Sequence, residues 1–144
     1  MYTWNRVPAL VLLVAGLWVT HVAAARTFLP PSVAFHVTAR RISASRIEVD
    51  FRIARGYLLD RRRISIRAAR PTIKVAFSLP AGTLYRIPYV APETVYKGTV
   101  AVQVAVTGKG APGALVLHVA LQGCAEAGIC YPPELRTLSV PPAR

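Results

Sequence analysis

The chain has 144 residues, of which 53% are hydrophobic and 17% are charged, with 18 Lys and Arg against 6 Asp and Glu. This length accommodates one domain with a single modest core and excludes several domains that each have their own core. The positive balance would suggest nucleic-acid binding inside a cell, but the interleaved aromatic and basic residues of RNA-binding platforms are missing.

The first 25 residues have the pattern of an export signal. Arg6 is followed by an apolar run over 7–19 and by three alanines at 23–25. We therefore expect a secretory signal peptide over 1–25, cleaved after Ala25, and a mature domain over 26–144. The apolar run of about 13 residues is shorter than the roughly 20 that span a bilayer, so a retained membrane anchor is the less favoured alternative.

Export changes the interpretation of the charge. The mature chain keeps 17 Lys and Arg against 6 Asp and Glu, a net charge of +11. Outside the cytoplasm we expect no nucleic-acid partner. We then expect the arginines at 61–63 and at 40–41 to lie on solvent-exposed faces. The alternative is that they attract acidic proteins or an anionic membrane surface.

The mature chain alternates apolar and polar residues with period two, which indicates strands with one buried face. The clearest example is "RIEVDFRI", where Ile47, Val49, Phe51 and Ile53 share one side. The segments that follow this pattern are, in chain order, 33–39, 46–53, 64–68, 72–79, 99–106, 114–122 and 135–140.

Turn signals such as Gly56, Pro71 and "TGKGAPG" separate these segments, and no window has a helical stripe. Seven or so short strands in this arrangement predict an all-β, immunoglobulin-like antiparallel β-sandwich. The segment 84–98 breaks the pattern with two prolines and three tyrosines. It is either an ordinary long connection or a loop with a function.

Cys124 and Cys130 are the only cysteines. In an oxidising compartment an even count with none left over predicts one intramolecular disulfide. The mature chain offers only His36 and His118 as histidines and has no methionine. A zinc or copper site is therefore hard to assemble, and we expect no metal and no organic cofactor.

The short spacing of the two cysteines leaves their role open. The five residues "AEAGI" between them suit a turn, so the pair would bridge two arms of a hairpin at one edge of the sandwich. Closing such a small loop restricts the unfolded chain only slightly and stabilises the folded state by only about 2 to 2.5 kcal/mol. As a structural link the disulfide is therefore modest. It is also well placed for attack by another protein's thiolate, so a structural and a redox-active disulfide both remain possible.

The segment "QGCAEAGICYPPE" resembles the active-site segment of the N-terminal periplasmic domain of DsbD, the bacterial thiol:disulfide interchange protein. Weaker similarity covers most of the mature chain, including "TFLPPSVAF", "ARGYLLDRRRISI" and "LPAGTLY". The resemblance implies an immunoglobulin-like fold, in agreement with the strand pattern.

The resemblance also implies a function. The chain would be a periplasmic relay that passes reducing equivalents between thioredoxin-like oxidoreductases, including those that serve cytochrome c maturation. Cys130 would form the mixed disulfide with each partner and Cys124 would resolve it. Tyr89, in "RIPYVAP", would be the aromatic residue of a cap over the disulfide, and Tyr131 and Pro132 would shape the site.

This sequence departs from the family pattern at several positions. Ile87 and Pro88 stand where the family has an acidic pair, and Leu58 and Asp60 stand where it has tyrosines. No membrane domain or thioredoxin-like domain follows in the sequence. We therefore expect a free-standing, monomeric relay with a separate membrane electron donor and no small-molecule substrate. The alternative is a secreted protein-binding sandwich with a purely structural disulfide.

Overall fold

A computed structural model of the chain describes residues 27–86 and 91–143. The signal peptide predicted over 1–25 and the residue predicted to form the cap, Tyr89, lie outside these ranges. The strands in chain order are β1 (Phe35–Ser43), β2 (Arg46–Ile53), β3 (Tyr57–Asp60), β4 (Ser65–Ala68), β5 (Lys74–Phe77), β6 (Thr83–Tyr85), β7 (Glu93–Tyr96), β8 (Thr99–Thr107), β9 (Leu115–Leu121), β10 (Gly123–Ala125) and β11 (Glu134–Val140). A single turn of helix, α1 (Pro31–Ala34), precedes β1, and a 3₁₀ turn, η1 (Arg61–Arg63), follows β3.

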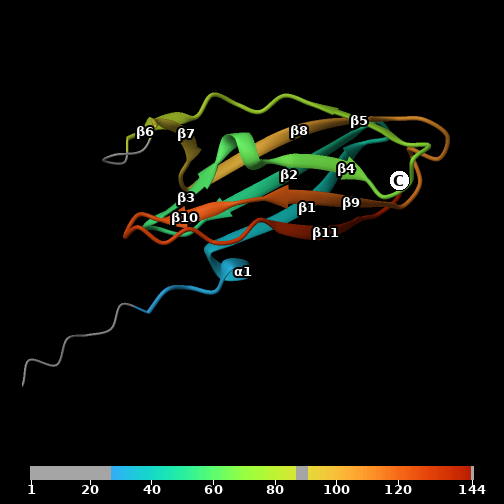
Figure 1. Cartoon of the computed structure of the whole chain (residues 1–144). Helices are drawn as coiled ribbons and strands as arrows, with labels where there is room; N and C mark the ends of the chain where they lie inside the picture. The colour runs from blue at the N-terminus through green and yellow to red at the C-terminus, as the bar shows by residue number, and fades with distance from the viewer. Residues whose placement is uncertain (1–26, 87–90, 144) are drawn as a thin grey trace, which may run out of the picture.

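The strands form three antiparallel sheets with the orders β1-β2-β8-β5, β10-β3-β7-β6 and β11-β9-β4. Only Gln122 separates β9 from β10, and only η1 and Ile64 separate β3 from β4. The second and third sheets therefore continue one another along the chain, and together they face the first. Figure 1 shows an elongated sandwich with β3, β6, β7 and β10 at one end. The predicted immunoglobulin-like β-sandwich is confirmed.

The core lies between the two layers and follows the predicted alternation. Ile47, Val49 and Phe51 of β2 are 0–1% exposed, and so are the inward residues of β8 and β9 (Val102, Val104, Val106, Leu117, Val119 and Leu121). All belong to one hydrophobic cluster. The outward residues of these strands are largely polar or small, which explains why a period of two identified them.

The seven predicted strands are present, with ends shifted by a few residues. Four further short strands were not predicted. In β3 the residues Tyr57, Leu58 and Leu59 are all buried, because neighbours cover both faces, so no alternation marks the strand. The segment 84–98, expected to be irregular, contributes to β6 and contains β7, which pair as a hairpin.

Among residues 27–86 and 91–143, no helix has the length and apolar character needed to cross a membrane.

Candidate functional site

Cys124 lies in the middle of β10, a short strand that was not predicted from the sequence. It pairs with Leu58 of β3, and β10 is the edge strand of its sheet. The residue before it must be glycine. A Cβ on Gly123 would come within 2.3 Å of the Phe35 ring and within 2.5 Å of the Leu58 carbonyl oxygen. The absence of a side chain at Gly123 thus lets the strand carrying Cys124 lie against the core.

The turn after β10 brings Cys130 back opposite Cys124. The Ala125 N–H donates to the Ile129 carbonyl at 2.7 Å, and the Tyr131 N–H donates to the Gly123 carbonyl at 2.9 Å. These two bonds flank the cysteines, which form an isolated antiparallel bridge with their Cα atoms 3.9 Å apart. The predicted disulfide joins them. Backbone hydrogen bonds, independent of the sulfur–sulfur bond, therefore also hold the pair together.

Gly128 makes this tight turn possible. Its φ of +100° is in the region that residues with a side chain rarely adopt, and its N–H donates to the Ala125 carbonyl at 2.9 Å. The Glu126 N–H donates to the Gly56 carbonyl at 2.8 Å, which ties the turn to the residue before β3.

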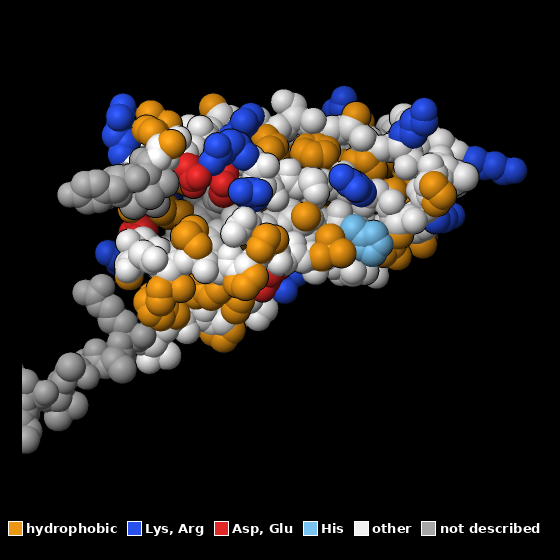
Figure 2. Space-filling model, viewed as in Figure 1, with side chains coloured by type: hydrophobic (Ala, Val, Ile, Leu, Met, Phe, Trp, Pro, Cys, Tyr) orange, Lys and Arg blue, Asp and Glu red, His pale blue; other side chains and the backbone are white. Residues whose placement is uncertain are grey.

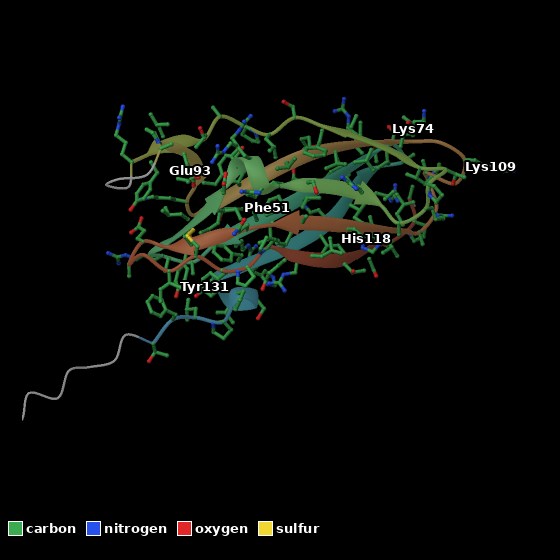
Figure 3. All side chains as sticks on the ribbon, in the orientation of Figure 1. Phe51, Lys74, Glu93, Lys109, His118 and Tyr131 are labelled. Carbon is green, nitrogen blue, oxygen red and sulfur yellow. A yellow bond between two sulfur atoms is a disulfide. The ribbon has the colours of Figure 1, made fainter. Side chains whose placement is uncertain are left out.

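The two sulfur-bearing residues differ in exposure. Cys130 is exposed, whereas Cys124 is half-buried within its strand. Figure 3 shows the disulfide as a yellow bond beside β10, at the same end of the molecule as Tyr131 and Glu93. An incoming thiolate from solvent therefore meets Cys130 first, which is the access that thiol–disulfide exchange requires.

Tyr131, the neighbour of Cys130, is held from several sides. Its ring packs edge-on against Phe35, with centroids 5.7 Å apart, and lies 6.2 Å from the ring of Tyr57. Its hydroxyl donates to the Leu29 carbonyl at 2.7 Å, and its own carbonyl accepts from the Gln122 side chain at 3.0 Å. Burial raises the pKa of Tyr131, and the Tyr57 hydroxyl raises this pKa further. The Tyr131 hydroxyl therefore stays protonated near neutral pH and can donate its hydrogen bond.

Pro132 and Pro133 are exposed and connect Tyr131 to β11. Proline fixes its own φ and restricts the residue before it to extended conformations. The chain leaving the cysteine turn is therefore stiff. This is consistent with the site-shaping role predicted for Tyr131 and Pro132, although the role itself stays a prediction.

Lys97, just after β7, links the β6–β7 hairpin to the cysteine turn. Its ammonium group donates a hydrogen bond to Glu126 and lies 5.1 Å from the centroid of the Tyr85 ring of β6. The hydrogen bond with Glu126 is the main cause that raises the pKa of Lys97. Glu126 is thus paired with a cation within the described part of the chain. The predicted cap residue, Tyr89, falls between β6 and β7 in the sequence but lies outside the described residues.

Sequence reasoning missed the residues that support the cysteines. Phe35, Tyr57 and Lys97 come from distant parts of the chain, and none has a local pattern that marks it. Gly123 is different, because a glycine directly before the first cysteine could have suggested close packing. Across residues 27–86 and 91–143, no cluster of three or more metal-ligating side chains is found.

These observations define a class: an immunoglobulin-like domain that presents a short-range disulfide on an exposed edge. The family profile described as "Thiol:disulfide interchange protein DsbD, N-terminal" matches residues 25–142. The chain therefore belongs to the DsbD N-terminal domain family, whose members take part in thiol–disulfide exchange. The predicted resemblance is confirmed.

Curated relatives agree with this assignment. The chain is 34% identical to DsbD of Ralstonia nicotianae over 122 residues, which cover 83% of this chain and 20% of that protein. It is also 34% identical to DsbD of Cronobacter sakazakii over 114 residues, which cover 79% and 19%. The chain thus spans about a fifth of the length of the curated relatives it matches.

Solved structures extend the similarity to three dimensions. The reduced form of the Neisseria meningitidis DsbD N-terminal domain aligns with a TM-score of 0.62 and 29% identity, covering 81% of this chain and 92% of that one. A complex between the DsbD and PilB N-terminal domains of the same organism aligns with a TM-score of 0.60 and 30% identity, covering 80% and 88%.

Proposed function

We propose that this chain is a periplasmic thiol–disulfide relay that passes reducing equivalents through a reversible Cys124–Cys130 disulfide. One observation carries the proposal: the exposed disulfide sits in a backbone bridge that is hydrogen-bonded on both sides without help from the sulfurs. Such a site can be reduced and re-oxidised without rebuilding the fold. The similarity to a DsbD N-terminal domain in its reduced form supports this.

In the first half of the cycle, the relay accepts electrons. A donor thiolate attacks the Cys130 Sγ, the Cys124–Cys130 bond breaks, and its electron pair stays on Cys124, which takes up a proton from water. The donor's second thiolate then attacks the donor sulfur of the mixed disulfide. Cys130 leaves as a thiolate and is protonated. Two electrons and two protons have been gained, and the donor is left as a disulfide.

In the second half, the relay passes the electrons on. The Cys130 thiolate attacks a partner disulfide and forms a new mixed disulfide, and one partner thiolate leaves. Cys124, as a thiolate, then attacks the Cys130 Sγ. This restores the Cys124–Cys130 bond and releases the second partner thiolate, so the partner leaves as a dithiol.

The assignment of roles to the two cysteines rests on access. Cys130 is exposed and meets the partner, whereas Cys124 is half-buried in β10 and faces Cys130 across the bridge. Cys124, as the resolving thiol, needs to reach only the Cys130 Sγ and not the partner protein. No metal or organic cofactor is required for either step.

The partners we propose are thioredoxin-like periplasmic oxidoreductases, including those of cytochrome c maturation, with a separate membrane protein as donor. The complex of a related DsbD domain with a PilB domain supports a protein partner. We also propose that 1–25 is a signal peptide removed on export, so that the working domain is 26–144. Intact-mass measurement of the protein from the periplasm tests this cleavage.

Tyr89 is proposed to cap the disulfide, by analogy with the family. The hairpin that carries it is tied to the cysteine turn through the Lys97–Glu126 ion pair, which supports this assignment. Tyr131 and Pro132 are proposed to fix the position of Cys130 and take no part in proton transfer.

Cysteine variants test the relay. With Cys124→Ser, the mixed disulfide formed at Cys130 cannot be resolved, so we expect a covalent complex with a thioredoxin-like partner on a non-reducing gel. Cys130→Ser should trap far less, because the remaining thiol is half-buried. If both variants trap nothing and lose stability equally, the disulfide is a staple, and the relay is wrong.

A further inference from the structure

A segment far from the cysteines in sequence forms part of their surroundings. Residues 27–30, here called the strap, run past the site before α1 begins. Both backbone groups of Leu29 are bound by tyrosine hydroxyls. The Leu29 N–H donates to the Tyr57 Oη at 2.7 Å, and the Leu29 carbonyl accepts from the Tyr131 Oη at 2.7 Å. One of these tyrosines is the residue next to Cys130.

The supports of the strap are rigid. Phe35 packs edge-on against both Tyr57 and Tyr131, at centroid distances of 6.0 and 5.7 Å. At the other end of the strap, the Pro30 carbonyl accepts from the N–H groups of Val33 and Ala34 at 2.9 Å each, and Ala34 is fully buried. The strap is thus fixed to the core on one side and to the cysteine turn on the other.

Apolar side chains of the strap, of α1 and of the cysteine turn face solvent. Leu29 is 37% exposed, and Val33 at the start of the fold is 56% exposed. Ile129, the residue before Cys130, is 43% exposed. Burial of such groups would be favourable, at roughly 25 cal/mol per Å² of apolar surface. The core of the molecule leaves them uncovered.

This surface also lacks charge, although the chain as a whole is strongly basic. No charged residue occurs in 27–35 or in 127–133, in a chain with a formal net charge of +12. Figure 2 shows hydrophobic side chains gathered on the lower side of the molecule, toward the place where Figure 1 draws α1, with Lys and Arg mostly elsewhere on the visible face. An uncharged surface can be dehydrated at low cost when another protein covers it.

We propose that Leu29 of the strap, together with Ile129, is a docking surface for the oxidoreductase whose thiol exchanges with Cys130. This inference rests on the proposed relay function. A partner sulfur that reaches Cys130 brings its own surface onto the residues beside it, and the tyrosine hydroxyls connect the strap directly to that position. The occupant is a thioredoxin-like protein with an uncharged, apolar surface around its reactive thiol.

The test compares a protein reductant with a small one. The rate of reduction of the Cys124–Cys130 disulfide is measured with reduced thioredoxin and with dithiothreitol, which needs no docking surface. For Leu29→Ala we expect the thioredoxin rate to fall about 5- to 10-fold, the size of a contact worth somewhat over 1 kcal/mol. The dithiothreitol rate should change less than about twofold.

Two control variants separate docking from general effects. Val116→Ala is the control for Leu29→Ala. It shortens an apolar side chain of similar exposure, 38%, on the outer face of β9, and it should leave both rates unchanged.

Tyr131→Phe is a second test variant. It removes one hydroxyl that holds the strap, and it should slow reduction by thioredoxin more than reduction by dithiothreitol. Tyr96→Phe is its match, because the Tyr96 hydroxyl donates to the Pro80 carbonyl at 2.6 Å and not to the strap.

Each other outcome overturns the proposal. Equal slowing of both reductants by Leu29→Ala would mean that the strap only shapes the disulfide, and no slowing would mean that the partner docks elsewhere. Failure of the unmodified protein to exchange with thioredoxin, or to be trapped through Cys124→Ser, would remove the relay itself. As a second measurement, hydrogen exchange in the trapped complex should slow in 28–36, and unchanged exchange there would also overturn the proposal.

Discussion

Gly123 illustrates how a single residue determines the position of the site. Its Cα lies against the Phe35 ring and the Leu58 carbonyl, with no room for a side chain on either side. The Gly123 carbonyl also accepts one of the two hydrogen bonds that flank the cysteine bridge. The same residue therefore lets β10 approach the core and holds Cys130 opposite Cys124.

Gly123→Ala should destabilise the protein by about 2–3 kcal/mol, since neither an aromatic ring in the core nor a strand carbonyl can move away cheaply. Chemical denaturation of the oxidised protein measures this. Gly113→Ala is the matched control, because its nearest contact would be 3.2 Å, and it should cost less than about 1 kcal/mol. Equal costs at the two positions would contradict the close packing at Gly123.

Tyr57 and Tyr131 are a second case in which single residues position a segment. The strap is not part of a sheet, and the two tyrosine hydroxyls bind its backbone in place of a neighbouring strand. Neither tyrosine could be assigned this role from the sequence, because Leu29 and Tyr131 are 102 positions apart. Only the cysteines, together with the "CYPPE" segment that follows, carry a local signal strong enough to be recognised.

At the level of elements, the important feature is the short strand β10 with its turn. Two backbone hydrogen bonds, at 2.7 and 2.9 Å, enclose the disulfide, and β10 pairs with β3. The disulfide closes only a small loop. Its contribution to stability is therefore small beside that of a core that includes residues from β1, β2, β8 and β9.

The double variant Cys124→Ser/Cys130→Ser should stay folded. We expect its free energy of unfolding to fall by only about 2 kcal/mol, the loop-closure term for a loop of this length. Near-ultraviolet circular dichroism should keep its native shape, because Tyr57 and Tyr131 remain packed. Loss of the folded state in this variant would show that the disulfide is a principal structural support.

The β6–β7 hairpin is the second element of interest, because the proposed cap residue falls between its two strands in the sequence. Tyr89→Ala should accelerate reduction of the disulfide by dithiothreitol on the order of fivefold, since a cap that is truncated protects the sulfurs less. Stopped-flow kinetics would measure this. Leu84→Ala, which shortens an exposed residue of the same hairpin, serves as the control. An unchanged rate for Tyr89→Ala would contradict the cap.

Across the whole molecule, the long strands of the sandwich have one face toward solvent and the other face in the core. That asymmetry is why seven strands could be predicted from alternation alone, with Ile47, Val49 and Phe51 in the core as expected. The prediction failed where both faces are covered, as in β3, and where strands are only three residues long, as in β6 and β10. Long-range contacts, which periodicity does not encode, arrange the site.

The sequence carried more information about function than about the details of the site. The two cysteines and the segment around them indicated the family, and the family profile confirmed it. The supports of the cysteines, among them Phe35, Gly123 and the strap, depend on which segments the fold brings together. Their identification required the structure.

The reduction potential of the Cys124–Cys130 pair tests the central claim most directly. It is measured by equilibrating the unmodified protein with a dithiol redox buffer and quantifying the reduced fraction. An exchange site that is exposed and supported by its backbone should have a potential above about −270 mV, in the range of exchange proteins. A potential below about −300 mV would mean a disulfide that resists reduction, and would contradict the relay.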